Sequence, residues 1–248
     1  MTGGAVLITG ASGGIGKALC ATFYDAGYKV IATSRSSKGI DTSKYSFISV
    51  SLEDLVLEDK VLNKFKKDVL NKLEGNRLTT IVNNAAVQIL GGTSELTAKD
   101  FQHSFNVNTL APFLLIQNFL PELEASNGSV LNIGTVHATA TKPEFAAYAT
   151  TKTAMHGLTR ALAVDLGGRI RINTLAPAAT ATPMLLAGFE GNSEAYNQLK
   201  KVHPIGRIAR PKEIGQMALF LCSNKAEFIT GATFYVDGGI LSRLHDPV

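Results

Sequence analysis

Short runs of β-branched and other apolar residues alternate with longer amphipathic segments along the whole chain. The runs have the length of strands and are bounded by glycine, proline or polar residues. The predicted strands are Ala5–Thr9, Lys29–Thr33, Tyr45–Val50, Thr79–Val82, Gly128–Ile133, Ile170–Leu175 and Thr233–Val236. Between them, apolar residues recur every three or four positions, and this spacing predicts amphipathic helices, as at Val61, Phe65, Val69 and Leu73.

This alternation predicts an α/β fold with a doubly wound parallel sheet of the Rossmann type, because strands joined through helices pair in parallel. The runs Val6–Ile8 and Thr80–Val82 carry apolar residues toward both faces, as expected for strands covered by helices on both sides in a three-layer αβα sandwich. No linker or internal repeat divides the chain, so residues 1–248 are predicted to form one domain. Residues 34–46 are predicted as a loop, and residues 177–210 as an irregular lid or binding segment.

Composition excludes several classes of protein. With 45% hydrophobic and 18% charged residues, the chain is not disordered. The longest apolar stretch, Leu110–Leu120, is interrupted by Pro112 and two polar residues, so we predict no membrane span. Residues 1–4 lead directly into a strand, so we expect no export signal and a cytoplasmic protein, with Cys20 and Cys222 buried and reduced. The net charge of +4 comes from scattered basic residues without interleaved aromatic ones, so nucleic acid is not an expected partner.

A glycine-rich turn follows the first predicted strand directly and opens a helical pattern, Thr9-Gly10-Ala11-Ser12-Gly13-Gly14-Ile15-Gly16. Glycines let the chain turn sharply and let backbone N–H groups approach a phosphate at the positive end of a helix. The spacing G-x3-G-x-G differs from the general dinucleotide pattern G-x-G-x-x-G. Such a turn can also merely close a tight joint, but its place between a strand and a helix favours phosphate binding.

Tyr148 and Lys152 stand four residues apart at the start of a long helical pattern that reaches Leu166, so they share one helix face. An ammonium near a phenol favours the phenolate, so Lys152 is predicted to lower the pKa of Tyr148 from about 10 toward working pH. A phenol tuned in this way can give or take the proton that accompanies hydride transfer. Alone, this spacing is common by chance and then marks surface residues.

Together these motifs resemble the short-chain dehydrogenase/reductase family, in its short, single-domain branch. The resemblance covers nearly the whole chain, and the motifs follow the family's order. The further matching segments are Asn83-Asn84-Ala85-Ala86, Asn108, Thr135, Asn173–Ala178 with Thr182, and Thr230–Gly239. The resemblance implies an oxidoreductase that interconverts a carbonyl and an alcohol on a small substrate with a nicotinamide cofactor and without a metal.

The resemblance also implies a role for each matching residue. Thr135 and Tyr148 hydrogen-bond the substrate oxygen, and Tyr148 transfers the proton. Lys152 binds the nicotinamide ribose, and Asn108 holds a water that links Lys152 to solvent. The residues expected to hold the cofactor are Gly10, Ser12, Gly13, Gly14, Ile15, Gly16, Arg35, Ser51, Leu52, Asn84, Ala85, Ala86, Tyr148, Lys152, Pro177, Thr180 and Thr182.

Three positions depart from the family's pattern, since Thr135 replaces serine and both Ala86 and Ala178 replace glycine. Thr135 keeps a hydroxyl, but its extra methyl narrows the pocket. Alanine is strained wherever φ must be positive, so the turns at Ala86 and Ala178 are expected to differ from those of the family. No departure removes a functional group, so we expect an active enzyme. The alternative is a catalytically silent nucleotide-binding regulatory or scaffold protein on the same fold.

Two further sets of residues have open roles. The side chains of Asn83 and Asn84 could merely satisfy backbone groups of the loop. His137 is a candidate substrate contact.

The end of the second predicted strand, Thr33-Ser34-Arg35-Ser36, concerns the choice of cofactor. Sites for NAD usually place an acidic side chain here, whereas an arginine accommodates the 2′-phosphate of NADP. Ser34 stands where the family's NAD-dependent members tend to carry Asp, and the planar fork of Arg35 suits a phosphate. We therefore predict NADP(H), with NAD(H) possible, because Gly13 stands where many NADP-dependent members carry a second cation. Arg35 could also be a solvated loop residue.

The resemblance finally implies a homotetramer or homodimer. The surfaces expected to join the copies are the predicted helices Asn108–Leu123 and Ala147–Leu166 and the C-terminal strand.

Overall fold

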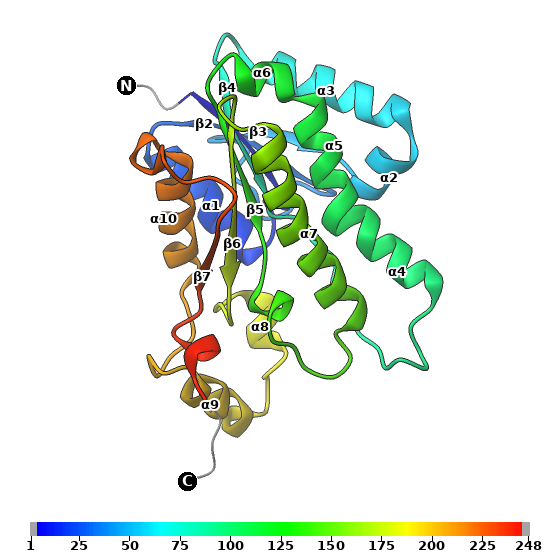
Figure 1. Ribbon diagram of the computed structural model, residues 1–248, viewed down its shortest axis with the longest axis vertical. Helices are drawn as coiled ribbons and strands as arrows, with labels where there is room; N and C mark the ends of the chain where they lie inside the picture. Colours follow the sequence, from blue (N-terminus) through cyan, green and yellow to red (C-terminus); the bar gives the residue numbers. More distant parts are fainter. Residues whose placement is uncertain (1–3, 245–248) are drawn as a thin grey trace.

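A computed structural model describes residues 4–244, so the two ends of the predicted domain, including residues 1–3 before the first strand, lie outside the described residues. The strands of its sheet are β1 (Ala5–Thr9), β2 (Lys29–Ser34), β3 (Ser46–Ser49), β4 (Leu78–Asn83), β5 (Ser129–Ile133), β6 (Arg171–Pro177) and β7 (Thr233–Val236). All neighbours are parallel, in the order β3-β2-β1-β4-β5-β6-β7 (Figure 1). The predicted Rossmann-type sheet is confirmed, and the predicted loop 34–46 joins β2 to β3.

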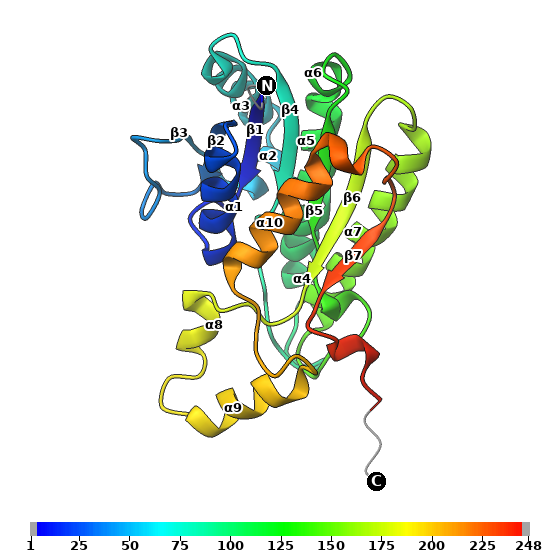
Figure 2. The same cartoon turned by 90° about the vertical axis from the view of Figure 1, so that its left-hand side faces the viewer.

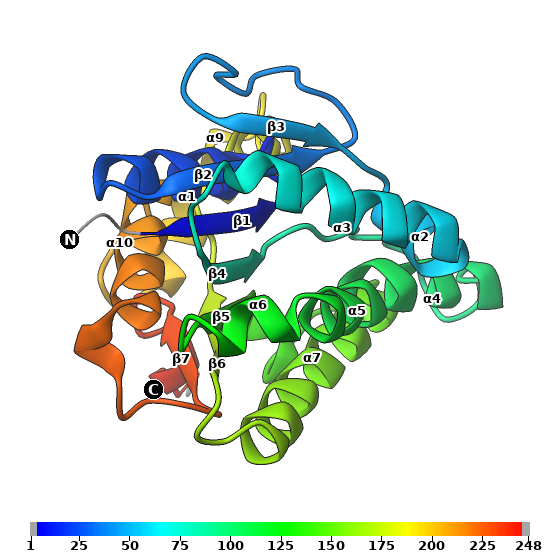
Figure 3. The ribbon, with the colours of Figure 1, turned by 90° about the horizontal axis from the view of Figure 1, so that it is seen from above.

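Helices cover both faces of the sheet. They are α1 (Gly14–Asp25), α2 (Leu52–Leu57), α3 (Asp59–Leu73), α4 (Ala98–Phe105), α5 (Ala111–Asn118), α6 (Leu120–Glu124), α7 (Ala146–Asp165), α8 (Pro183–Ala187), α9 (Ser193–Val202) and α10 (Pro211–Cys222). Seen from above, α1 and α10 lie on one side of the sheet and α3, α5 and α7 on the other (Figure 3). Val6 and Ile8 of β1 pack toward α1 and α10, and Leu7 packs in the opposite core. This arrangement confirms the three-layer αβα sandwich.

Two further observations concern the composition-based expectations. Cys20 and Cys222 are free and buried, and burial raises the pKa of both thiols to about 12, so they are unreactive. Within residues 4–244, no helix combines the length and the apolar character needed to cross a membrane.

The predicted continuous helix Asn108–Leu123 is wrong. The chain instead forms one π-helical turn at Asn106–Leu110, then α5, and then a break at Phe119 before α6. Pro112 and Pro121 give the physical reason, because each lies in the first turn of its helix and has no N–H to continue the helix before it. The other predicted long helix agrees with α7 to within one residue.

The segment 177–210 is more regular than predicted, because it contains α8 and α9. The Thr182 hydroxyl caps α8 by accepting the N–H three residues later at 3.2 Å, and the Asn192 side chain caps α9 in the same way at 3.0 Å. These caps, and not a hydrophobic period, begin the two helices. Both helices lie beyond the carboxyl ends of β6 and β7, and the chain returns from them to α10 (Figure 2). We call residues 178–210 the lid.

The position of the site follows from the strand order. The chain runs outward from β1 through β2 to β3, then returns to β4 and runs outward the other way to β7. The connections that leave β1 and β4 therefore diverge at the carboxyl ends of these two strands. Such a divergence opens the crevice in which parallel α/β sheets bind their ligands.

Candidate active site

The glycine-rich turn lies at the carboxyl end of β1, in this crevice. Gly10 has a left-handed backbone with φ of +66°, and a Cβ there would lie 2.7 Å from the Cα of Ala85. A Cβ on Gly16 would meet the carbonyl oxygen of Gly10. α1 begins at Gly14, and no side chain caps its first turn. A glycine-rich turn at a helix N-terminus that no side chain caps has the form that a pyrophosphate requires.

The segment that follows β4 packs against this turn. The Thr9 hydroxyl accepts the backbone N–H groups of Asn84 and Ala85, each at 3.0 Å. Asn84 Nδ2 donates to the carbonyl oxygens of Thr9 and Gly10 at 2.8 and 3.1 Å. The amide of Asn84 therefore shapes the glycine-rich turn, which is the alternative role that the sequence left open. Ala86 is exposed and does not have a positive φ, so the strain expected there is absent.

The first arm of the lid reaches the same turn. This arm begins after Pro177, which ends β6, and Ala178 has no positive φ either, so no strain marks its departure from the family's glycine. The buried Thr180 donates to the carbonyl of Ala178 at 3.1 Å. Thr182 lies over the start of α1, because a Cβ on Gly14 would come within 2.7 Å of its side chain. The lid and the glycine-rich turn thus enclose the predicted phosphate site from two sides.

The predicted catalytic residues Thr135, Tyr148 and Lys152 come together at the carboxyl end of β5. Lys152 is 1% exposed, and its Nζ donates to the carbonyl of Ile133, the last residue of β5, at 2.7 Å. The same Nζ lies 6.0 Å from the centre of the Tyr148 ring. Thr135 is buried two residues beyond β5, and its hydroxyl interacts with that of Tyr148.

Burial sets the protonation of this group. Burial raises the pKa of Tyr148 to about 12, while hydrogen bonding to Thr135 acts in the opposite direction. Burial also lowers the pKa of Lys152 to about 8. The predicted lowering of the pKa of Tyr148 by Lys152 is therefore wrong for the chain alone, because lost hydration around the phenol dominates and the opposing effect comes from Thr135. At neutral pH Tyr148 is a protonated phenol and Lys152 is an ammonium.

Asn108 lies in the π-helical turn and is fully buried. Its Oδ1 accepts from the Val87 N–H at 2.8 Å, and its Nδ2 donates to the Val87 carbonyl and the Thr151 hydroxyl at 2.9 and 3.0 Å. The side chain therefore ties the loop after β4 to α7, and its donors have no capacity left for a water. The backbone carbonyl of Asn108 is better suited, because Pro112, four residues later, has no N–H with which to donate the usual helical bond to it.

His137 lies beside Tyr148, where the sequence left it as a candidate substrate contact. Its ring stacks on Phe145 with centroids 4.5 Å apart and meets the edge of the Tyr148 ring at 6.3 Å. Its Nδ1 is 3.2 Å from the hydroxyl of Thr141. Burial, together with the charge of Lys142, lowers the pKa of His137, so this imidazole is neutral at pH 7. An aromatic wall thus flanks the phenol.

The predicted determinant of cofactor choice is exposed. Within the described chain, the Arg35 guanidinium forms no ion pair or hydrogen bond, and Arg35 lines a groove of about 670 Å³ together with Ser51. The neutral Ser34 side chain interacts with the backbone of Ser36. Ser51 caps α2, whereas the Leu52 side chain is buried in the core and offers little surface to a ligand in this groove.

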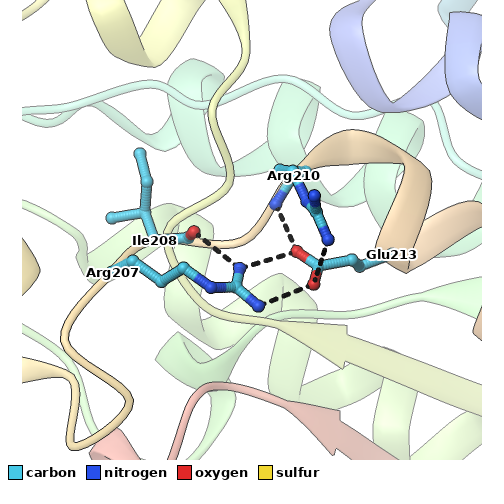
Figure 4. Close-up of polar contacts among 4 residues, drawn as sticks. All are labelled: Arg207, Ile208, Arg210 and Glu213. Carbon is cyan, nitrogen blue, oxygen red and sulfur yellow. Dashed lines mark hydrogen bonds and ion pairs between the residues drawn. The ribbon is translucent and has the colours of Figure 1, made fainter.

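Sequence reasoning missed the ion cluster that fastens the returning arm of the lid (Figure 4). Glu213, in the first turn of α10, accepts two hydrogen bonds from the Arg207 guanidinium at 2.8 Å each. It also accepts from the backbone N–H and the side chain of Arg210 at 2.7 and 3.2 Å. Between the two arginines, Ala209 pairs with Thr180 of the first arm. A glutamate three residues after a helix boundary is a capping signal that could have indicated part of this cluster.

Comparisons with known proteins identify the family and fold to which the chain is similar. A family model described as enoyl-(acyl carrier protein) reductase matches residues 10–241. The human protein dehydrogenase/reductase SDR family member 4 is 31% identical, over 96% of this chain and 87% of its own. The ligand-free aldohexose dehydrogenase of Thermoplasma acidophilum has a TM-score of 0.90 at 28% identity, covering 99% of this chain and 97% of its own. ElxO with NADP bound has a TM-score of 0.86 at 26% identity, covering 97% and 99%.

Proposed function

The chain belongs to the short-chain dehydrogenase/reductase family of oxidoreductases, and from this premise we propose that it interconverts a carbonyl and an alcohol on a small substrate. The observation that carries the proposal is the meeting of Thr135, Tyr148 and Lys152 at the sheet edge that also holds the glycine-rich turn. Burying an ammonium costs free energy, and buried ionisable groups with shifted pKa values beside a phenol are concentrated at catalytic sites. The alternative, a silent scaffold, is therefore disfavoured.

The glycine-rich turn fits a nicotinamide dinucleotide, because glycines precede α1 and no side chain caps the backbone N–H groups of its first turn. When bound in reduced form, this cofactor supplies a hydride to the carbonyl carbon. Tyr148 donates its phenolic proton to the carbonyl oxygen, and its raised pKa holds the proton until that oxygen becomes basic. Thr135 donates a hydrogen bond to the same oxygen and stabilises its developing negative charge. In the reverse direction the phenolate accepts the proton of the alcohol.

Lys152 supports this proton transfer. One of its three donors is used by the carbonyl of Ile133, so two remain for the hydroxyls of the nicotinamide ribose and for water. Its ammonium stabilises the phenolate that Tyr148 becomes after donating its proton. Lys152 then passes a proton to the phenolate, which restores the Tyr148 phenol, and a water on the backbone carbonyl of Asn108 returns a proton from solvent to Lys152.

A screen of carbonyl and alcohol substrates, followed at the absorbance of the reduced nicotinamide, tests the proposed function. The panel includes aldohexoses and 3-oxoacyl thioesters, because an aldohexose dehydrogenase and a 3-oxoacyl-[acyl-carrier-protein] reductase are among the proteins that the chain resembles. We expect turnover of at least one small carbonyl or alcohol. Cofactor binding without turnover of any substrate would favour the silent scaffold.

The preferred cofactor in this proposal is NADP(H). Arg35 is exposed and free of ion pairs within residues 4–244, and the neighbouring Ser34 carries no charge that would repel a 2′-phosphate. ElxO, which has a similar structure, holds NADP. A charge-assisted hydrogen bond is worth about 1.5–3 kcal/mol, which corresponds to roughly ten- to a hundredfold in affinity.

Replacing Arg35 with Ala should therefore weaken NADPH binding by roughly ten- to a hundredfold and leave NADH binding unchanged. Titration of both cofactors into the wild type and Arg35→Ala measures this. Lys38→Ala is the matched control, because it removes another exposed cation from the same loop. Equal or tighter binding of NADH than of NADPH by the wild type would overturn the assignment.

A further inference from the structure

α7 presents polar side chains to the sheet and to its helical neighbours. The fully buried residues of this helix include Lys152 and Thr159, and His156 is nearly so. A helix that packs on a sheet usually does so through an apolar stripe. Hydrogen bonds are directional, so they specify one position of a helix more strictly than apolar contacts do. The polar face of α7 is therefore suited to fixing its register.

A row of buried hydrogen bonds crosses the sheet beneath α7. Asn83 of β4, Asn132 of β5 and Thr174 of β6 are register neighbours on adjacent strands. Asn83 Nδ2 donates to Asn132 Oδ1 at 2.8 Å, and Asn132 Nδ2 donates to the Thr159 hydroxyl at 2.9 Å. The Thr159 hydroxyl is also 2.8 Å from that of Thr174. Because all these groups are buried, water cannot replace a lost partner.

Lys152 provides a second point of attachment, through its hydrogen bond to Ile133 of β5. Seven residues separate Lys152 from Thr159, which is about 10 Å along a helix that rises about 1.5 Å per residue. Between them, His156 packs so closely on Gly134 that a Cβ there would meet its Nε2. Two attachments this far apart oppose both sliding and rotation of α7 on β5.

The register of α7 determines where Tyr148 lies relative to Thr135, because Thr159 and Tyr148 share a helix and Asn132 and Thr135 share a strand end. We propose that Thr159 is a positioning residue, whose hydrogen bonds to Asn132 and Thr174 hold Tyr148 against Thr135. This inference rests on the proposed function, in which the hydroxyls of Tyr148 and Thr135 bind the same substrate oxygen.

Three variants test the proposal. Thr159→Val removes the hydroxyl with little change of shape and leaves both of its partners unpaired. Thr159→Ser keeps the hydroxyl and serves as the conservative rescue. Thr80→Val is the matched control, because the Thr80 hydroxyl is buried in β4 and has no hydrogen-bond partner in the described chain.

We expect Thr159→Val to lower kcat by about tenfold or more, since a small displacement of a catalytic group can cost up to about a hundredfold. Any change in the KM for the cofactor should be smaller than the loss of kcat, because the glycine-rich turn is untouched and only Lys152 moves with α7. The apparent pKa in the pH profile of kcat should rise, because the interaction with Thr135 lowers the pKa of Tyr148. Thr159→Ser and Thr80→Val should keep the wild-type kcat and pH profile.

An unchanged kcat and pH profile in folded Thr159→Val would overturn the proposal, and so would an equal loss in Thr80→Val. If Thr159→Val does not fold, Thr174→Val removes only one of the two hydrogen bonds. Thr174→Val should then show a smaller loss of kcat, and the apparent pKa in its pH profile should also rise. A wild-type kcat and pH profile in Thr174→Val would overturn the proposal.

Failure of the proposed function looks different, because the wild type itself would then show no turnover. Crystal structures of the wild type and Thr159→Val decide the positioning role in that case. The proposal expects α7 to move on β5, so that the hydroxyls of Tyr148 and Thr135 separate in the variant. An unchanged separation would overturn it.

Discussion

His156 is a buried imidazole one helical turn beyond Lys152. Its Nε2 has no hydrogen-bond partner among the described residues. Burial, and next the charges of Lys152 and Arg160, lower its pKa to about 4. The fold therefore holds His156 in its neutral form, whereas an unfolded chain takes up a proton near pH 6.5.

The free energy of unfolding should therefore depend on His156 between pH 6.5 and pH 4. In this window the unfolded chain binds a proton that the folded chain does not, so stability falls as pH falls, by up to about 3 kcal/mol. Denaturant unfolding of the wild type and His156→Leu at several pH values measures this difference. The variant should lose less stability than the wild type on acidification. Identical pH dependence of the two proteins would show that the folded chain accommodates the charged imidazole.

The residues of the candidate site differ in how far the sequence indicates them. Tyr148 and Lys152 could be paired because their spacing lies within one helix, and Thr135 followed from the family's motif. The direction of the pKa shift of Tyr148 could not be predicted, because it depends on burial by segments distant in sequence. The hydrogen bonds between Asn108 and Val87 and between Thr159 and Asn132 could not be predicted for the same reason, because each joins elements that are distant in sequence.

At the scale of elements, strands were easier to predict than helix breaks. β1 and β7 have the predicted bounds because each is a short apolar run between glycine or polar residues. The break at Phe119 was missed because a hydrophobic period continues across a single non-helical residue. The π-helical turn at Asn106–Leu110 has no characteristic residue type that would indicate it.

The lid connects the ion cluster on α10 to the proposed cofactor site. Ala209, between the clamped arginines, donates to the carbonyl of Ala179 at 2.9 Å and accepts from the N–H of Ala181 at 2.8 Å. Thr182 follows Ala181 directly in the chain, and its side chain lies over Gly14. Loosening the cluster should therefore release the lid from the glycine-rich turn.

Glu213→Gln tests this connection, because it removes the charge and keeps the shape. These ion pairs are largely exposed to solvent, which screens them, so NADPH binding should weaken by no more than about fivefold. Glu190→Gln removes an exposed lid carboxylate that has no ion pair within the described residues, and it should bind NADPH normally. Cofactor titrations compare the two variants. Equal affinities in both variants and the wild type would exclude a role of the cluster in cofactor binding.

At the scale of the whole molecule, one side of the structure has an uncovered edge. β7 pairs only with β6 in the described sheet, and Tyr235 on it is 42% exposed. Phe228 nearby in sequence is fully exposed, and Val164 on α7 is 85% exposed. An open strand edge offers unpaired backbone groups to another chain, and exposed apolar side chains beside it can add to such a contact. We propose a homo-oligomer, a dimer or tetramer, that covers these surfaces.

Sedimentation at micromolar concentration should therefore give a mass that is a multiple of 26.3 kDa. Phe228→Asp places a charge in the proposed contact and should shift the equilibrium toward the monomer. Leu57→Asp changes an exposed leucine on α2, which follows β3 at the opposite edge of the sheet from β7, and should leave the mass unchanged. A wild-type mass of one chain would refute the proposal.

The central claim is that Tyr148 transfers the proton, and its most direct test is turnover by Tyr148→Phe. This substitution removes the hydroxyl and keeps the ring that packs on His137 and Phe145. Because general acid–base catalysis contributes about 10²–10⁴-fold, kcat should fall at least about a hundredfold. The NADPH affinity of the variant, titrated in parallel, should stay within about twofold of the wild type. Near-normal turnover by Tyr148→Phe would contradict the account.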